Sequence, residues 1–133
     1  MSSFHFEIVA PEKLMFSGSV QSVSLASSEG EMTIFANHAP LMAMLKPGII
    51  TVNEEGGAVQ KLFVKGGFAD VAPTGLTVLA ETATPLADLN TAAIEAHIAA
   101  AQTDLDAAKT LESKRLASEK LDQMRELKAA LAL

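Results

Sequence analysis

The chain has 133 residues, 49% of them hydrophobic, and a net charge of −6. It is long enough for one domain with a core, and it has no cysteine, which excludes disulfides, thiol catalysis and zinc–thiolate sites. The acidic charge argues against nucleic-acid binding and against lying on an anionic membrane, and no run reaches the roughly 18 apolar residues of a membrane-spanning helix.

Glycine and proline divide the chain near Pro85. All eight glycines and all five prolines lie in residues 1–85, whereas residues 86–133 contain neither and include 13 alanines. Gly and Pro interrupt helices and Ala favours them. The sequence therefore predicts a β-rich domain over 1–85 and a helical domain over 86–133.

Short alternating runs between turn signals fill the first domain. In the first run, Phe4, Phe6 and Ile8 share one face, and because this alternation begins at Phe4 we expect no signal or transit peptide before the fold. Further strands are expected at 20–25, 32–35, 41–45, 49–52, 62–65, 68–71 and 76–80. Loops are expected at 53–57 and 73–75, and Gly66-Gly67 suggests a bulge or bend. Many short strands of this kind predict a β-sandwich or flattened barrel.

Two helices are expected in the second domain, with Asp88 or Asn90 as the first N-cap. Apolar residues recur at helical spacing along each, and a turn is expected at 109–112, where the two stripes fall out of phase. The stripes are Ile94, Ile98, Ala101, Leu105 and Ala108, then Ala117, Leu121, Met124, Leu127 and Leu131. The result is a two-helix hairpin. Its alanine-rich faces offer little area for burial against the β-rich domain. We therefore expect a hairpin that docks on that domain and can detach from it.

Candidate catalytic groups are few. The motifs of a nucleophile elbow and of a phosphate-binding loop are absent, and His5, His38 and His97 are too scattered for a metal site. Glu29 and Glu31 are close enough to suggest an acid–base pair, but with glycine between them in a turn we expect a solvated surface patch. His97 borders the first apolar stripe and is expected to be a half-buried structural residue.

One stretch carries a family signature. Glu29-Gly30-Glu31-Met32-Thr33-Ile34 is followed by Asn37-His38-Ala39-Pro40-Leu41 and then by Leu45-Lys46-Pro47-Gly48. This order resembles the epsilon subunit of F-type ATP synthases, as do Phe6-Glu7-Ile8-Val9-Ala10-Pro11-Glu12 and Gly66-Gly67-Phe68-Ala69-Asp70-Val71. Mitochondrial delta subunits are close relatives of that family, and the early start of the first strand favours the bacterial type.

The resemblance implies a non-catalytic rotor subunit without cofactor or metal. In the family, one sandwich face binds the gamma subunit, loops contact the membrane c ring, and the subunit couples gamma rotation to proton flow. Carried over by position, it implies c-ring contact at Glu31 and His38, with Glu29 and Met32 as neighbouring contacts. The acidic first domain, with net charge −4, suits the arginine-bearing c-ring loops of the family. The resemblance also implies a peripheral location at the cytoplasmic face of the bacterial inner membrane.

The resemblance further implies that the second helix can contact the alpha and beta subunits and inhibit ATP hydrolysis. Its candidate contacts are Lys114, Arg115, Lys120, Arg125 and Lys128, but residues 112–133 carry a net charge of only +1, and Arg115 and Glu119 are spaced to pair on one helix. We therefore expect weak modulation. Some relatives bind ATP through an acid and an arginine that are replaced here by Asn90 and Ala93, so we expect weak or no ATP binding.

Two alternatives remain open from the residues alone. A stand-alone β-sandwich module that binds a small ligand or carbohydrate would need an aromatic-lined site, and the chain has no Trp or Tyr. An enzyme that used Glu29, Glu31 and His38 would need a pocket and a shifted carboxylate pKa.

Overall fold

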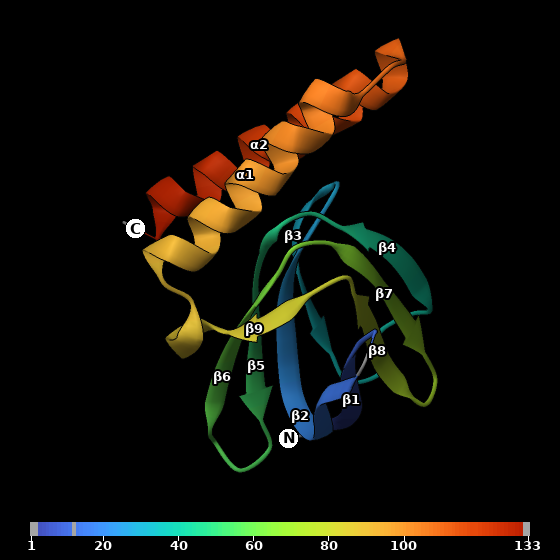
Figure 1. Ribbon diagram of the computed structural model, residues 1–133. Helices are drawn as coiled ribbons and strands as arrows, with labels where there is room; N and C mark the ends of the chain where they lie inside the picture. The colour runs from blue at the N-terminus through green and yellow to red at the C-terminus, as the bar shows by residue number, and fades with distance from the viewer. Residues whose placement is uncertain (1–2, 12, 132–133) are drawn as a thin grey trace. The chain divides into compact units, whose positions relative to one another are not determined.

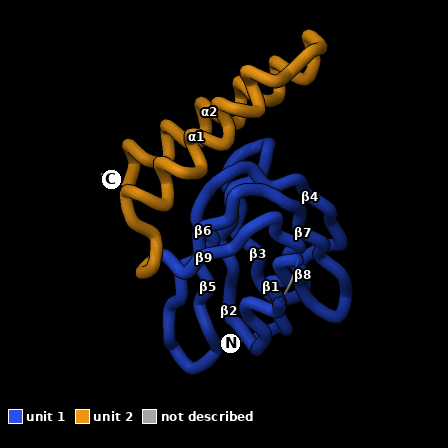
Figure 2. Tube along the Cα trace, in the orientation of Figure 1, with its two compact units in different colours: residues 1–86 blue, residues 87–133 orange. Residues whose placement is uncertain are grey.

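A computed structural model describes residues 3–11 and 13–131 of the chain. The chain divides into two compact units, residues 1–86 and residues 87–133 (Figure 2). The first unit is built from strands and the second from helices, as the distribution of glycine, proline and alanine predicts.

Within the described residues, nine strands form the first unit (Figure 1). In chain order they are β1 (Phe4–Ala10), β2 (Lys13–Ser27), β3 (Gly30–Phe35), β4 (Leu41–Leu45), β5 (Gly48–Glu54), β6 (Val59–Val64), β7 (Gly67–Ala72), β8 (Gly75–Ala80) and β9 (Ala83–Pro85). The predicted strands are all present, and the loops at 53–57 and 73–75 join β5 to β6 and β7 to β8. The sequence reading missed the short β9 and the first half of β2.

Strand β2 is long because it belongs to both layers of the fold. Its first half pairs with β1, its second half pairs with β3 and β5, and the register shifts between Val20 and Ser22, where the strand passes from one layer to the other. One layer runs β4-β7-β8-β1 to the first half of β2, with β1 and β8 parallel. The other runs from β3 through the second half of β2 to β5, β6 and β9. This is the expected sandwich.

The core lies between these layers and is aliphatic with a little aromatic content. Successive side chains of a strand point to opposite faces, so every second residue points into the core. The core residues that are at most 1% exposed include Phe6, Ile8, Val20, Val23, Ile34, Ile50, Val52, Leu76 and Val78. The rings of Phe6 and Phe16 lie 5.6 Å apart between centroids. The predicted inward face of the first strand is therefore confirmed.

Gly67 marks the bend between β6 and β7. Its φ is +136°, and a Cβ built on it would lie 2.0 Å from the carbonyl oxygen of Leu79 on β8. Only glycine tolerates both the backbone conformation and the approach of the neighbouring strand. The predicted irregularity at Gly66-Gly67 is thus a bend at the start of β7.

The second unit follows the 3₁₀ turn η1 (Leu86–Asp88) and holds α1 (Thr91–Ala107) and α2 (Leu111–Ala130), which pack against each other. Asn90 is the N-cap of α1, and its side chain accepts from the amide of Ala93 at 2.8 Å. Thr110 caps α2 in a reciprocal capping box with Ser113. The observed turn begins one residue earlier than the predicted 109–112 and is shorter, because Ala108 is already the C-cap of α1 and α2 starts at Leu111.

The buried residues of the two helices are Ile94, Ala101, Leu121 and Met124, all members of the predicted stripes. His97 is partly buried, as expected. Over residues 3–11 and 13–131, no helix has the length and apolar character that crossing a membrane requires.

Candidate docking surface

The outer face of the β4-β7-β8-β1-β2 layer carries a row of apolar side chains. Strand register places Met44 beside Phe68, Phe68 beside Leu79, Leu79 beside Val9, and Val9 beside Leu14, one residue from each strand. We call this row, together with Met42, the apolar stripe.

Much of the stripe is open to solvent. The exposed fractions are 67% for Met42, 64% for Met44, 55% for Leu14 and 40% for Leu79, and Val9 and Phe68 are partly exposed. A hollow of about 470 Å³ lies along it, lined by Val9, Met44, Phe68, Leu79 and neighbouring residues that include Pro11 and Glu81. Contiguous exposed apolar surface of this kind typically marks a protein–protein contact.

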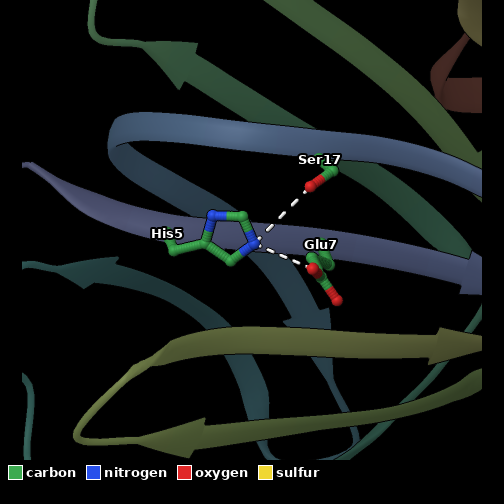
Figure 3. Close-up of polar contacts among 3 residues, drawn as sticks. All are labelled: His5, Glu7 and Ser17. Carbon is green, nitrogen blue, oxygen red and sulfur yellow. Dashed lines mark hydrogen bonds and ion pairs between the residues drawn. The ribbon is translucent and has the colours of Figure 1, made fainter.

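Beyond the stripe, the same face turns polar. The next row runs Met42, Asp70, Thr77, Glu7 and Ser17. His5 Nε2 lies 2.8 Å from Glu7 Oε1 and 3.5 Å from Ser17 Oγ (Figure 3). Both contacts meet the same ring nitrogen, whereas a catalytic triad requires the acid and the hydroxyl on opposite nitrogens. This exposed cluster is a polar border of the stripe.

The outer face of the other layer is mixed. Ser24 Oγ and Thr33 Oγ1 are 3.0 Å apart across β2 and β3, and the Asn53 amide donates to Ser22 Oγ at 3.0 Å. The cross-strand row through this pair runs Phe35, Ser22, Asn53 and Val59, so polar side chains separate the exposed Phe35 (60%) from the exposed Val59 (56%). The stripe has no such interruption, and it is therefore the stronger docking candidate.

Glu29, Glu31 and Met32 lie together at the hairpin between β2 and β3. Ser27 shapes this turn, since its hydroxyl donates to the carbonyl of Gly30 at 2.7 Å and accepts from the amide of Glu29 at 3.2 Å. Glu29 and Glu31 are exposed and Met32 packs partly against the core. The pair forms a solvated acidic patch, as the sequence predicts.

His38 lies past the opposite end of β3. Four residue steps of about 3.3 Å each lie between Glu31 and Phe35 at the end of β3, so roughly 13 Å of strand separates Glu31 from the turn that carries His38. The structure therefore does not bring together the three residues that the enzyme alternative requires. Among the described residues no cluster of three His, Asp or Glu could hold a metal ion either.

His38 borders a cleft of about 310 Å³ at its end of the sandwich. Phe4, Phe35, Pro40 and Pro73 contribute its apolar walls, and His38 Nδ1 donates to the carbonyl of Ala39 at 2.8 Å. Asn37 turns the chain there with a φ of +64°, a conformation that asparagine adopts more readily than most residues.

In the helical unit, ion pairs engage some of the candidate cations. Arg115 pairs with Glu119 at 2.8 Å along α2, which confirms the expected i,i+4 pair, and Lys128 pairs with Glu95 across to α1. Lys114 and Arg115 also line an apolar hollow near the turn, where Leu111 is 88% exposed. Because Arg115 and Lys128 are paired within the hairpin, these cations are less available to an acidic partner.

Comparison with known proteins identifies the family. The profile of the ATP synthase delta/epsilon chain β-sandwich domain matches residues 3–86, which is the whole strand-built unit. The chain belongs to the ATP synthase delta/epsilon family. It is similar to the ATP synthase epsilon chain of Parvibaculum lavamentivorans, with 51% identity over 93% of this chain and 94% of that one. The epsilon chain of Rhizobium rhizogenes is 46% identical over 84% of this chain and 83% of its own length.

Solved structures agree on the fold of this family member. A chain in the mitochondrial ATP synthase of Euglena gracilis matches with a TM-score of 0.73 and 24% identity, over 97% of this chain and 81% of that one. A chain in the central stalk and c ring of the Tetrahymena thermophila enzyme matches with a TM-score of 0.68 and 14% identity, over 97% and 96%. The small-ligand alternative is not favoured, because the matched relatives are ATP synthase chains over nearly their full length.

The sequence reading identified the family but missed the stripe. Its members come from five strands and are separated by up to 70 residues, so only strand register brings them together. One signal was available: Met42 and Met44 alternate with Leu41 and Leu45 in a strand whose two faces are both apolar. Strands of sheets that are covered on both faces are hydrophobic on both faces, so this pattern is the signal that could have pointed to the stripe.

Proposed function

We propose that this chain is a non-catalytic subunit of the ATP synthase central stalk and that its apolar stripe docks on the gamma subunit. The observation that supports this is the continuous row of apolar residues from Met44 to Leu14 across five strands, whereas polar side chains interrupt the exposed hydrophobic residues of the other face. Such a row loses water on docking and fixes the sandwich against the shaft. The polar cluster around His5 then forms the rim.

The stripe contributes part of the free energy that a stable contact needs. Full burial of a Leu or Met side chain contributes about 1.5–3 kcal/mol. Four members of the stripe are 40–67% exposed, so docking recovers roughly half of that from each, or about 4 kcal/mol in all before the cost of association. Further contacts outside the stripe supply the remainder.

Glutamate substitution tests the stripe. Met44→Glu places a charge in the centre of the contact and is expected to weaken gamma binding at least tenfold in calorimetry. Val59→Glu is the matched control, because Val59 is also an exposed strand residue (56%, against 64% for Met44) but lies on β6 in the other layer. Equal affinity of the two variants would exclude the stripe as the gamma contact.

We propose that the acidic turn with Glu29, Glu31 and Met32 contacts the c ring, and that His38 is a second candidate contact. Because β3 separates them, the two candidates can be tested independently. If the turn carries the contact, Glu31→Lys lowers ATP-driven proton pumping in the reconstituted enzyme and His38→Ala does not. If instead His38→Ala lowers proton pumping and Glu31→Lys does not, the c-ring contact lies at His38 and not at the acidic turn.

We also propose a peripheral location at the cytoplasmic face of the bacterial inner membrane, and a weak influence of the helical hairpin on ATP hydrolysis through contact with the alpha and beta subunits. ATPase turnover of the assembled head, with residues 1–133 or with residues 1–87, tests the hairpin. A several-fold rise on removal of residues 88–133 would mean that the hairpin inhibits strongly, despite its ion-paired cations.

A further inference from the structure

Two methionines stand out on the surface of the sandwich. Met42 and Met44 lie two residues apart on β4, on the same face, and are 67% and 64% exposed. Among the other described methionines, Met15 and Met32 are partly buried against the core, and Met124 is 0% exposed. The most exposed thioethers of the described chain are therefore both in the apolar stripe.

We infer that Met42 and Met44 form an oxidation site that controls docking of the stripe, an inference that rests on the proposed function of the stripe. The oxidant is hydrogen peroxide. It transfers one oxygen atom to the thioether sulfur, so that an S–O bond forms, the O–O bond breaks, sulfur is oxidised to the sulfoxide and the peroxide is reduced to water. Exposure of the thioether decides which methionine reacts first.

The surroundings of these residues make the product costly to bury. A sulfoxide oxygen is a hydrogen-bond acceptor, and it loses water when the stripe is covered. Met44 has Phe68 as its cross-strand neighbour, whose side chain offers no hydrogen-bond donor. Met42 has Asp70, whose ionised carboxylate can only accept. Neither sulfoxide finds a donor from its neighbour on β7, so oxidation turns an apolar anchor into an unpaired polar group.

Docking and oxidation exclude each other. In the free chain the thioethers are open to peroxide and their sulfoxides are open to a reductase, whereas the docked partner covers both. Oxidation then acts before assembly: a free chain with sulfoxides at 42 and 44 docks poorly until it is reduced, and an assembled chain is protected.

Peroxide treatment of the full-length chain tests this directly. Mass spectrometry of digested protein is expected to place the first two added oxygen atoms on Met42 and Met44. Calorimetry with the gamma subunit is expected to show at least a tenfold loss of affinity after treatment, and methionine sulfoxide reductases are expected to restore it. Gamma bound in advance should slow the oxidation of both residues.

Each variant serves as its own reference in this experiment. The double variant M42L/M44L is compared before and after peroxide, and its affinity should change less than twofold across the treatment. The control Met15→Leu keeps both stripe methionines and should still lose tenfold. First oxidation at Met15 or Met32 would overturn the exposure argument.

The outcomes separate this inference from the proposed function. If Met44→Glu abolishes gamma binding but oxidised wild-type chain binds normally, the oxidation site is wrong and the docking face stands. If neither change affects binding, the docking face itself is wrong. If oxidation weakens M42L/M44L as much as the wild type, the sensitive group lies elsewhere in the chain.

Discussion

Replacement of Gly67 by alanine probes the point where β7 begins and the stripe is held in register. Gly67 pairs with Leu45 on one side and Ala80 on the other, so it lies between two strands that each contribute to the stripe. An alanine Cβ there would meet three backbone atoms, the Leu79 carbonyl oxygen at 2.0 Å, the Ala80 Cα at 2.9 Å and the Leu79 carbonyl carbon at 3.0 Å. Backbone cannot rotate aside as a flexible side chain can.

Two terms set the size of the effect. Holding a residue with a Cβ at a φ of +136° costs about 1–3 kcal/mol. Separation of β7 from β8 to relieve the contact breaks at least one ladder hydrogen bond, about 1 kcal/mol more. The free energy of unfolding should therefore fall by about 2–4 kcal/mol. In a unit of this size each kcal/mol lowers Tm by about 4–8 °C, so a loss of roughly 10 °C or more is expected.

Scanning calorimetry is the suitable assay, because the chain has no Trp or Tyr for intrinsic fluorescence and the helices dominate circular dichroism. Gly56→Ala is the matched control: Gly56 lies in the loop between β5 and β6, and its added Cβ would meet nothing within 4 Å. That variant should stay within about 0.5 kcal/mol of wild type. Equal unfolding temperatures of Gly67→Ala and Gly56→Ala would refute backbone strain at position 67.

Three other predictions concern the helical unit. Thr110→Ala removes the acceptor for the Ser113 amide, which lies 3.0 Å away, and should cost about 1 kcal/mol in thermal unfolding followed at 222 nm; an unchanged transition would mean that the capping box does not contribute. Leu121→Ala, at a residue only 3% exposed, should cost about 2–5 kcal/mol, whereas Leu116→Ala at a residue 51% exposed should cost under about 1 kcal/mol; similar losses would contradict the observed burial. Calorimetry should detect weak or no ATP binding, and clear saturation at physiological concentration that is lost in Asn90→Ala would overturn this expectation.

The outer faces of the sandwich differ in how continuous their apolar surface is. The acidic turn and the polar side chains of the other layer interact well with water when the chain is free, whereas burial of the apolar stripe against a partner is favourable. This difference is the physical basis on which we propose the gamma contact at the stripe and the c-ring contact at the acidic turn.

Local chemistry was sufficient for much of this fold. Phe6 and Ile8 alternate with polar residues, and this pattern lies entirely within neighbouring positions of the chain. The inward face of β1 can therefore be predicted without knowing which strands pair with it. The same holds for the Asn90 cap, where a side chain bonds to a backbone amide three residues away. The absence of Gly and Pro after residue 85 likewise determined the helical character of the second unit.

The tertiary structure alone decided the surfaces. Val9, Leu14, Met44, Phe68 and Leu79 are unremarkable in sequence and become one row only because the strands pair in a particular register. The same register separates Glu31 from His38, which are seven positions apart in the chain but lie toward opposite ends of β3. Register depends on contacts between residues far apart in the chain, and no local preference encodes it. A sequence therefore indicates which residues face outward, and only the folded chain determines which of them meet.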